Sequence, residues 1–225
     1  MSRGKQFTLC SFVHGTNGWK VAFVLEELAL EYETIYLDQP ENKPLIPQYV
    51  PKCNPNARFP ILIDHENNDF VVWESNAIIT YLVQKYDTSL KISVDDPKEK
   101  IIQLQWLLFQ ASGQGPSFGQ AAWFKSSHPE TLPSAIERYM KETLRIFGVL
   151  ETVLSRQEWL VGGKYTVADI SFIPWNEYAL RGFLADHDGF NFEKDFPSVY
   201  KWYQAMLARP SIAEVIAVKE SMMTK

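Results

Sequence analysis

The stretch Phe70-Val71-Val72-Trp73-Glu74-Ser75-Asn76-Ala77-Ile78 runs from a strand-like apolar segment directly into a predicted helix. A carboxylate and a hydroxyl therefore lie side by side at the junction. In one interpretation Ser75 only caps the helix, because serine is a favoured N-cap. In the other, Glu74 accepts hydrogen bonds from an ammonium group, while Ser75 and the positive helix end bind a carboxylate, so that together they hold an amino acid zwitterion.

The segments around this junction alternate between strand and helix. Strand-like runs are expected at residues 6–12, 33–37, 61–64 and 70–73, and helices are expected from near Asn17 and over 75–86. The alternation in 6–12 indicates a strand with one buried face. The first helix has Val21, Val24, Leu25 and Leu28 at helical spacing, with Lys20, Glu26 and Glu27 on another face.

The order of these segments predicts the topology. Strand, helix and strand in quick succession form a βαβ unit with parallel strands. Two apolar runs around the polar loop 65–69 are typical of an antiparallel hairpin. Six prolines between Asp38 and Pro60 leave room for at most a short helix, near 47–50. We therefore expect a thioredoxin-like domain over residues 1–90.

Beyond a boundary near residues 88–95 only helical periodicity remains, so residues 95–225 are expected to form an all-helical domain. Helices are predicted from Pro97 to about Leu108, over 133–157, over 166–182 and over 197–208, with a Gly-rich interruption at 113–119. Thr166 and Asp169 have the spacing of a capping box, which begins a core helix. The fold class is thus α/β followed by all-α.

Composition excludes several classes of function. Hydrophobic residues make up 46% and charged residues 22% of the 225 residues, and the net charge is −5, so a nucleic-acid partner is not expected. No run approaches the ~20 apolar residues that cross a bilayer, and no signal peptide begins the chain. Two cysteines, Cys10 and Cys53, and four histidines show no metal-ligand spacing. We expect a cytoplasmic protein with no metal and no membrane partner.

Two further positions allow both a structural and a functional interpretation. Asn17 is a good N-cap, but its amide can also donate to a thiolate held at the helix end, where the helix dipole favours the anion. Pro60 can mark a sheet edge. In a thioredoxin-like domain a proline at this point is usually cis, and Phe59 then offers its N–H and C=O to an extended peptide.

Taken together, these motifs resemble the glutathione transferase superfamily along essentially the whole chain. Within that superfamily the motifs resemble the fungal nitrogen-regulator type and its bacterial Nu-class relatives. It is carried by five motifs in order: Thr16-Asn17-Gly18-Trp19-Lys20-Val21, Asn54-Pro55-Asn56-Ala57-Arg58-Phe59-Pro60, Trp73-Glu74-Ser75-Asn76-Ala77-Ile78, Phe118-Gly119-Gln120 and Ala135-Ile136-Glu137-Arg138-Tyr139. The regulator has a long Asn-rich extension before this module and this sequence has none, so its prion-like role is not expected here.

The resemblance implies a glutathione site. Glu74 and Ser75 would hold the γ-glutamyl zwitterion, the backbone of Phe59 would pair with the cysteinyl part, and Asn17 would face the sulfur. The glycine carboxylate would need a cation from the Pro-rich segment, for which Lys43 is the first choice and Lys52 the second. Arg138 matches a family arginine thought to reach the site, although a surface ion pair is the rival interpretation.

Phe118, Trp123 and Phe124 would contact the second substrate, unless they belong to the core. That substrate would be a small hydrophobic electrophile, a disulfide or a glutathione conjugate. The leading hypothesis is a homodimeric glutathione transferase that also acts in disulfide reduction, deglutathionylation or peroxide reduction, as in detoxification, through an Asn-stabilised thiolate. The alternative is a binding or regulatory module with little catalysis.

Overall fold

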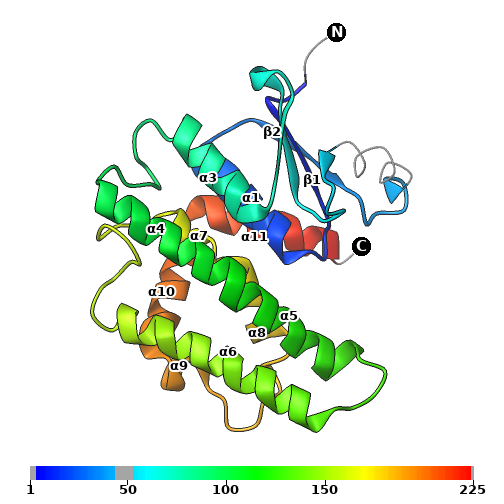
Figure 1. Cartoon of the computed structure of the whole chain (residues 1–225), viewed down its shortest axis with the longest axis vertical. Helices are drawn as coiled ribbons and strands as arrows, with labels where there is room; N and C mark the ends of the chain where they lie inside the picture. The colour runs from blue at the N-terminus through cyan, green and yellow to red at the C-terminus, as the bar shows by residue number, and fades with distance from the viewer. Residues whose placement is uncertain (1–3, 44–52, 224–225) are drawn as a thin grey trace. The chain divides into compact units, whose positions relative to one another are not determined.

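The computed structural model describes residues 4–43 and 53–223. The chain divides into two compact units (Figure 1), residues 1–92 together with 208–225, and residues 93–207. The sequence assigned residues 95–225 to a single helical domain, whereas the last helix of the chain packs on the first helix and belongs to the first unit. The short helix expected near 47–50 lies outside the described residues.

The first unit contains a four-stranded sheet in the order β2-β1-β3-β4. Its strands are β1 (Phe7–Ser11), β2 (Tyr32–Tyr36), β3 (Ile61–Asp64) and β4 (Phe70–Trp73). β1 pairs with β2 in parallel and with β3 antiparallel, and β3 and β4 form the antiparallel hairpin. The predicted βαβ unit and hairpin are both confirmed.

β1 is buried over its whole length, so the expectation of a single buried face is wrong. Neighbouring strands cover its two edges and α1 packs against one face. On the other face Cys10 lies in an apolar cluster against which Cys53 and Phe59 pack. Its polar residues are accommodated by hydrogen bonds: Thr8 Oγ1 donates to a Glu33 carboxylate oxygen at 3.1 Å and lies 2.9 Å from His65 Nε2.

Three α-helices of the described residues complete this unit: α1 (Thr16–Glu27), α3 (Ser75–Tyr86) and α11 (Pro210–Met223). α1 packs against β1, α3 and α11. Sequence periodicity did not reveal α11 as a helix. At Gly18 the first turn of α1 lies so close to β1 that a Cβ atom would be 1.7 Å from Ser11 Oγ, which explains the glycine.

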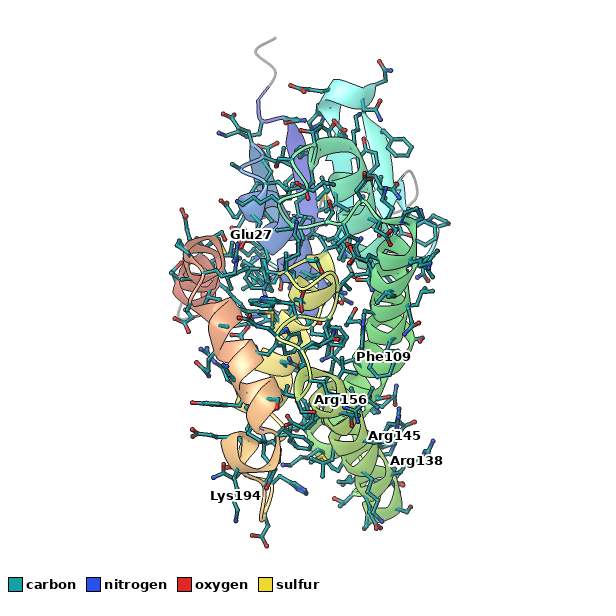
Figure 2. The ribbon with its side chains drawn as sticks, turned by 90° about the vertical axis from the view of Figure 1, so that its left-hand side faces the viewer. Glu27, Phe109, Arg138, Arg145, Arg156 and Lys194 are labelled. Atoms are coloured by element: carbon teal, nitrogen blue, oxygen red, sulfur yellow. The ribbon has the colours of Figure 1, made fainter. Side chains whose placement is uncertain are left out.

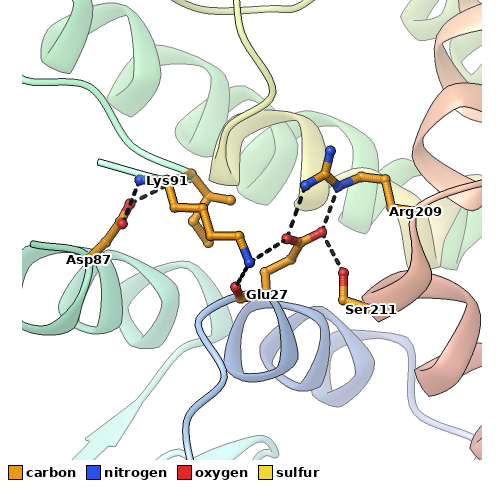
Figure 3. A network of polar contacts seen from close by, with 6 residues as sticks. Glu27, Asp87, Lys91, Arg209 and Ser211 are labelled. Atoms are coloured by element: carbon orange, nitrogen blue, oxygen red, sulfur yellow. Dashed lines mark hydrogen bonds and ion pairs between the residues drawn. The ribbon is translucent and has the colours of Figure 1, made fainter. Parts of the chain in front are cut away.

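A buried ionic network joins α11 to α1 (Figure 3). The Glu27 carboxylate is 1% exposed and accepts hydrogen bonds from Arg209 Nε at 2.6 Å and Arg209 Nη2 at 3.1 Å. Ser211 Oγ donates to the same carboxylate at 2.6 Å, and Lys91 Nζ lies 3.5 Å from it. Glu27 is therefore an internal anchor for the last helix, which corrects its assignment to a polar helix face.

The second unit is built of helices joined by loops, and an isolated β-bridge between Val161 and Lys164 lies in one of these loops. Its helices are α4 (Pro97–Phe109), α5 (Gly115–Ala122), α6 (Pro133–Leu154), α7 (Val167–Ile170), α8 (Ile173–Arg181), α9 (Phe192–Asp195) and α10 (Pro197–Leu207). The predicted capping box is confirmed at the start of α7. Its Asp169 is fully buried and also accepts a hydrogen bond from Trp202 Nε1 at 2.9 Å.

The sequence predicts that the Gly-rich segment 113–119 interrupts the helix after α4. The structure shows no interruption there. Two π-helical segments, Gln110–Gln114 and Trp123–Ser127, flank α5 and continue the helical path. The Gly115 N–H donates to the Gln110 carbonyl, five residues back. Pro116 follows this π turn and lies in the first turn of α5, where a proline is tolerated.

Candidate glutathione site in the first unit

Four of the predicted site residues meet at one pocket of the first unit, with a volume of about 220 Å³. They are Asn17 from α1, Phe59 before β3, and Glu74 and Ser75 at the start of α3. The lining is completed by Asn54, Arg58 and Pro60. Residues from three separate motifs of the sequence thus line a single cavity.

Asn17 is not the cap of α1. The N-cap is Gly15 and no side chain caps this helix end, so Asn17 is the second helical residue. The first turn of α1 carries no acidic residue, so its positive dipole end is not neutralised there. Asn17 therefore brings an amide to a helix end that favours a bound anion.

Phe59 enters the pocket from the segment before β3. The Phe59-Pro60 peptide bond is cis, as predicted. The Phe59 ring packs on Phe12 with 4.8 Å between centroids, and Asn54 Nδ2 donates to the Arg58 carbonyl at 2.6 Å. These contacts fix the Phe59 ring and the backbone directly before it.

Glu74 is exposed and adopts a left-handed backbone conformation with φ 69°. Such a conformation is costly for a residue with a side chain, and residues that adopt it are concentrated at functional sites. Glu74 is the N-cap residue of α3, yet no side chain makes a capping hydrogen bond. The interpretation of Ser75 as a simple cap is therefore wrong. Ser75 is the first helical residue, 7% exposed.

The Ser75 hydroxyl is instead bonded to Lys20 of α1. Lys20 is 1% exposed, and its Nζ donates to Ser75 Oγ at 3.0 Å and to Asn76 Oδ1 at 2.8 Å. Burial lowers the pKa of Lys20 to about 7, against the opposing effect of the Glu74 carboxylate. The sequence pattern predicts that Lys20 lies on the polar face of its helix. The structure shows that Lys20 is buried, so that prediction is wrong. Its position three residues after Asn17, on the same helix face, was the available signal.

Two pocket residues, Asn54 and Arg58, were not singled out from the sequence as site residues. Both precede Phe59 in the Asn54–Pro60 motif, and that adjacency was the signal. Arg58 is exposed and adds a cation to the lining. Lys43 is exposed and is not among the described residues that line this pocket. Lys52 lies outside the described residues.

The other predicted site residues belong to the second unit. Arg138 is exposed and lies on the outer side of α6, as does Arg145 (Figure 2). Trp123 is 49% exposed, and Phe124 stacks on Tyr139 with 5.6 Å between centroids. Phe118 is fully buried and packs on Phe147 and Phe183. Phe118 is therefore a core residue, which corrects its expected contact with a substrate.

Within residues 4–43 and 53–223, no helix combines the length and hydropathy that a bilayer crossing requires. The same residues contain no group of His, Cys, Asp and Glu side chains placed to hold a metal ion. Neither Cys10 nor Cys53 forms a disulfide. Burial raises the pKa of Cys10 to about 12, with further contributions from Cys53 and Glu33.

The first unit has a thioredoxin-like sheet and a polar pocket at the starts of two helices, and the second unit is helical. These features place the chain in the class of proteins that combine a thioredoxin-like domain with a helical domain. The chain belongs to the glutathione S-transferase family. Residues 5–84 match the model of the family's N-terminal domain and residues 116–210 that of its C-terminal domain.

The relatives of the chain are nitrogen-regulator-like members of this family. Glutathione S-transferase 1 of Schizosaccharomyces pombe is 47% identical over 92% of this chain and 93% of its own. Protein URE2 of Meyerozyma guilliermondii is 37% identical over 93% of this chain and 79% of its own. The structure of Ure2p5 from Phanerochaete chrysosporium, cocrystallised with 1-(S-glutathionyl)-2,4-dinitrobenzene, has 52% identity and a TM-score of 0.91, covering 100% of this chain and 99% of that one.

Proposed function

We propose that the protein is a glutathione-dependent transferase that binds glutathione in the pocket of the first unit. Glu74 accepts hydrogen bonds from the γ-glutamyl ammonium, Ser75 binds the α-carboxylate, and the Phe59 backbone pairs with the cysteinyl part. The observation that carries this proposal is the meeting of Asn17, Phe59, Glu74 and Ser75 at one cavity. Further support comes from Ure2p5, which was crystallised with an S-glutathionyl compound.

Asn17 acts on the glutathione sulfur. Asparagine cannot take up a proton at neutral pH, so its role is to donate to the thiolate once it has formed. The positive end of α1, whose first turn carries no acidic residue, adds to that stabilisation. A sulfur activated in this way reduces disulfides, removes glutathione from conjugates and reduces peroxides, because the cofactor itself supplies the nucleophile.

The ends of the bound molecule are assigned by charge. The glycine carboxylate needs a cation, and Arg58 is our first choice because it lines the pocket, with Lys43 as the alternative. In the second unit, we assign Trp123 and Phe124 to the second substrate and Arg138 to the neighbourhood of glutathione, as the family resemblance implies. The second substrate is a small hydrophobic electrophile, a disulfide or a glutathione conjugate.

We also propose that the protein is a homodimer. On α4 the apolar residues Ile101, Leu104 and Leu108 are 64%, 44% and 58% exposed. Their spacing places them on one helix face, and contiguous apolar surface of this kind marks an interface. A second copy of the chain is the partner that would cover this face.

The test of the function is a steady-state assay with a mixed glutathione disulfide, coupled to glutathione reductase. Replacing Asn17 by Ala should lower kcat/KM roughly 100-fold, the usual effect of removing one donor to a developing anion. It should also raise the pKa of bound glutathione, followed by thiolate absorbance. Asn191→Ala removes an asparagine that caps α9 in the second unit and should leave turnover unchanged.

Failure of this assay has a defined meaning. If wild type and Asn17→Ala bind glutathione but are equally inert with electrophiles, disulfides and peroxides, the protein is a glutathione-binding module rather than an enzyme. If Asn17→Ala retains full turnover in an active protein, the thiolate is stabilised by another group.

A further inference from the structure

Lys20 is a buried basic residue that is hydrogen-bonded to Ser75 of the candidate site. It lies on α1 three residues after Asn17, and its Nζ reaches the start of α3, where it donates to Ser75 and Asn76. An ammonium group that is 1% exposed is costly to bury unless it is paired. A Met or Leu side chain would fill the same space without that cost, so packing alone does not explain the lysine.

The direction of the Lys20–Ser75 hydrogen bond determines what Ser75 can do. A serine hydroxyl has one hydrogen to donate and lone pairs that accept. Because Lys20 donates to Ser75 Oγ, the hydroxyl hydrogen is left to donate to another acceptor. Ser75 lines the pocket, so that acceptor can be a ligand atom, and donation from a cation to the oxygen strengthens the onward hydrogen bond.

We propose that Lys20 is the positioning residue for the carboxylate half of this site. It fixes the Ser75 hydroxyl as a donor to the α-carboxylate of the γ-glutamyl group, and its charge compensates that carboxylate. This inference rests on the proposed function and assigns the two ends of the zwitterion to two charges: the ligand ammonium to Glu74 and the ligand carboxylate to Lys20 through Ser75.

The electrostatics around Lys20 agree with this division. Burial lowers the pKa of Lys20, and the Glu74 carboxylate acts in the opposite sense. An α-carboxylate bound at Ser75 would bring a second negative charge near the ammonium and favour its charged form further. Lys20 therefore acts on the ligand carboxylate through Ser75. The thiolate is stabilised by Asn17, not by Lys20.

The test pairs a variant with a change in the ligand. Lys20→Met removes the charge at similar side-chain volume, and γ-aminobutyryl-cysteinyl-glycine is glutathione without its α-carboxylate. Affinities of wild type and variant for both ligands are measured by calorimetry. Lys20→Met should weaken glutathione binding roughly 10- to 100-fold, the effect of losing a hydrogen bond to a charged group, and change the affinity for the analogue less than about threefold.

Three further measurements separate positioning from a general structural role. In steady state Lys20→Met should raise KM for glutathione and leave kcat largely unchanged. Lys20→Arg keeps the charge and should recover part of the lost affinity for glutathione. The analogue without the amino group, glutaryl-cysteinyl-glycine, should bind more weakly than glutathione by the same factor in wild type and Lys20→Met, because Glu74 recognises that end.

Two results would overturn the proposal: equal weakening of both ligands by Lys20→Met, which indicates only a structural role, or no effect on either ligand. Both results presuppose that wild type binds glutathione. If wild type does not bind glutathione at all, the proposed function itself fails, and that outcome is visible before any variant is made.

Discussion

Arg209→Met should destabilise the protein substantially, because it leaves the buried Glu27 carboxylate without its bidentate partner. Removing one member of a buried ion pair typically costs about 3–5 kcal/mol. Arg209 is 32% exposed, and Ser211 and Lys91 still contact Glu27 in the variant. We therefore expect the lower end of the range, a loss of about 3 kcal/mol in the free energy of unfolding at pH 7.

The pH dependence of this loss follows from the pKa of Glu27. Burial raises that pKa, but hydrogen bonds from Arg209 and Ser211 and the charges of Arg209 and Lys91 outweigh it and hold it below 4.5. A carboxyl whose pKa is lowered by folding contributes stability above its unfolded-state pKa and loses it as the pH falls through the folded value. Because the unfolded state is common to both proteins, the difference should shrink as the pH falls through the Glu27 pKa of the variant, which lacks Arg209, toward the lower pKa of wild type.

The assay is urea unfolding followed by tryptophan fluorescence and by far-ultraviolet circular dichroism, whose coincidence checks two-state behaviour. Arg145→Met is the matched control, since Arg145 makes a similar bidentate contact with Glu142 but is 54% exposed. It should cost about 0.5 kcal/mol or less. Equal losses in the two variants, or a loss below about 1 kcal/mol for Arg209→Met, would refute the anchoring role of Glu27.

Two other predictions concern the thiols and the exposed helix face. Replacing Cys10 and Cys53 together by Ser should leave kcat/KM within about threefold, because Cys10 is fully buried with a pKa raised to about 12 and is not a thiolate at neutral pH. A collapse of turnover at unchanged circular dichroism would instead assign the chemistry to a cysteine. Leu108→Lys should convert a dimer to a monomer in light scattering after gel filtration, and a variant that stays dimeric at micromolar concentration would exclude α4 from the interface.

The sequence predicts the first unit well where local patterns dominate. Apolar runs of strand length, the polar hairpin loop and the Pro-rich segment are each signals that depend on near neighbours, and the sheet order follows from them. The candidate site was likewise visible as three short motifs. Asn17, Phe59 and Glu74-Ser75 are brought together because the thioredoxin-like topology places the start of each helix near the cis-proline segment.

What the sequence does not predict depends on distant partners. Lys20 and Ser75 are 55 positions apart, and Glu27 and Arg209 are 182 positions apart, so neither pair leaves a periodic signal. Charged residues are rarely buried, so sequence periodicity assigns them to the surface and misses the few that are buried. The expected contact of Phe118 with the second substrate is wrong for the converse reason. The sequence of a Gly-rich segment does not distinguish an aromatic residue that lines a pocket from one that fills a core.

The π-helical segment Gln110–Gln114 joins α4 to α5 and allows the two helices to present different faces to their surroundings. One added residue in a helix turn rotates everything after it by about 100° around the axis. If the same residues formed an uninterrupted α-helix, position 115 would lie on the same face as Leu108, seven residues earlier, and would share its exposure. Instead Gly115 is buried, and a Cβ there would be 3.4 Å from Trp175 Nε1. The extra residue thus separates the outward apolar stripe of α4 from the inward packing of α5, so deleting one residue and returning this turn to α-helical geometry would leave both faces where they are.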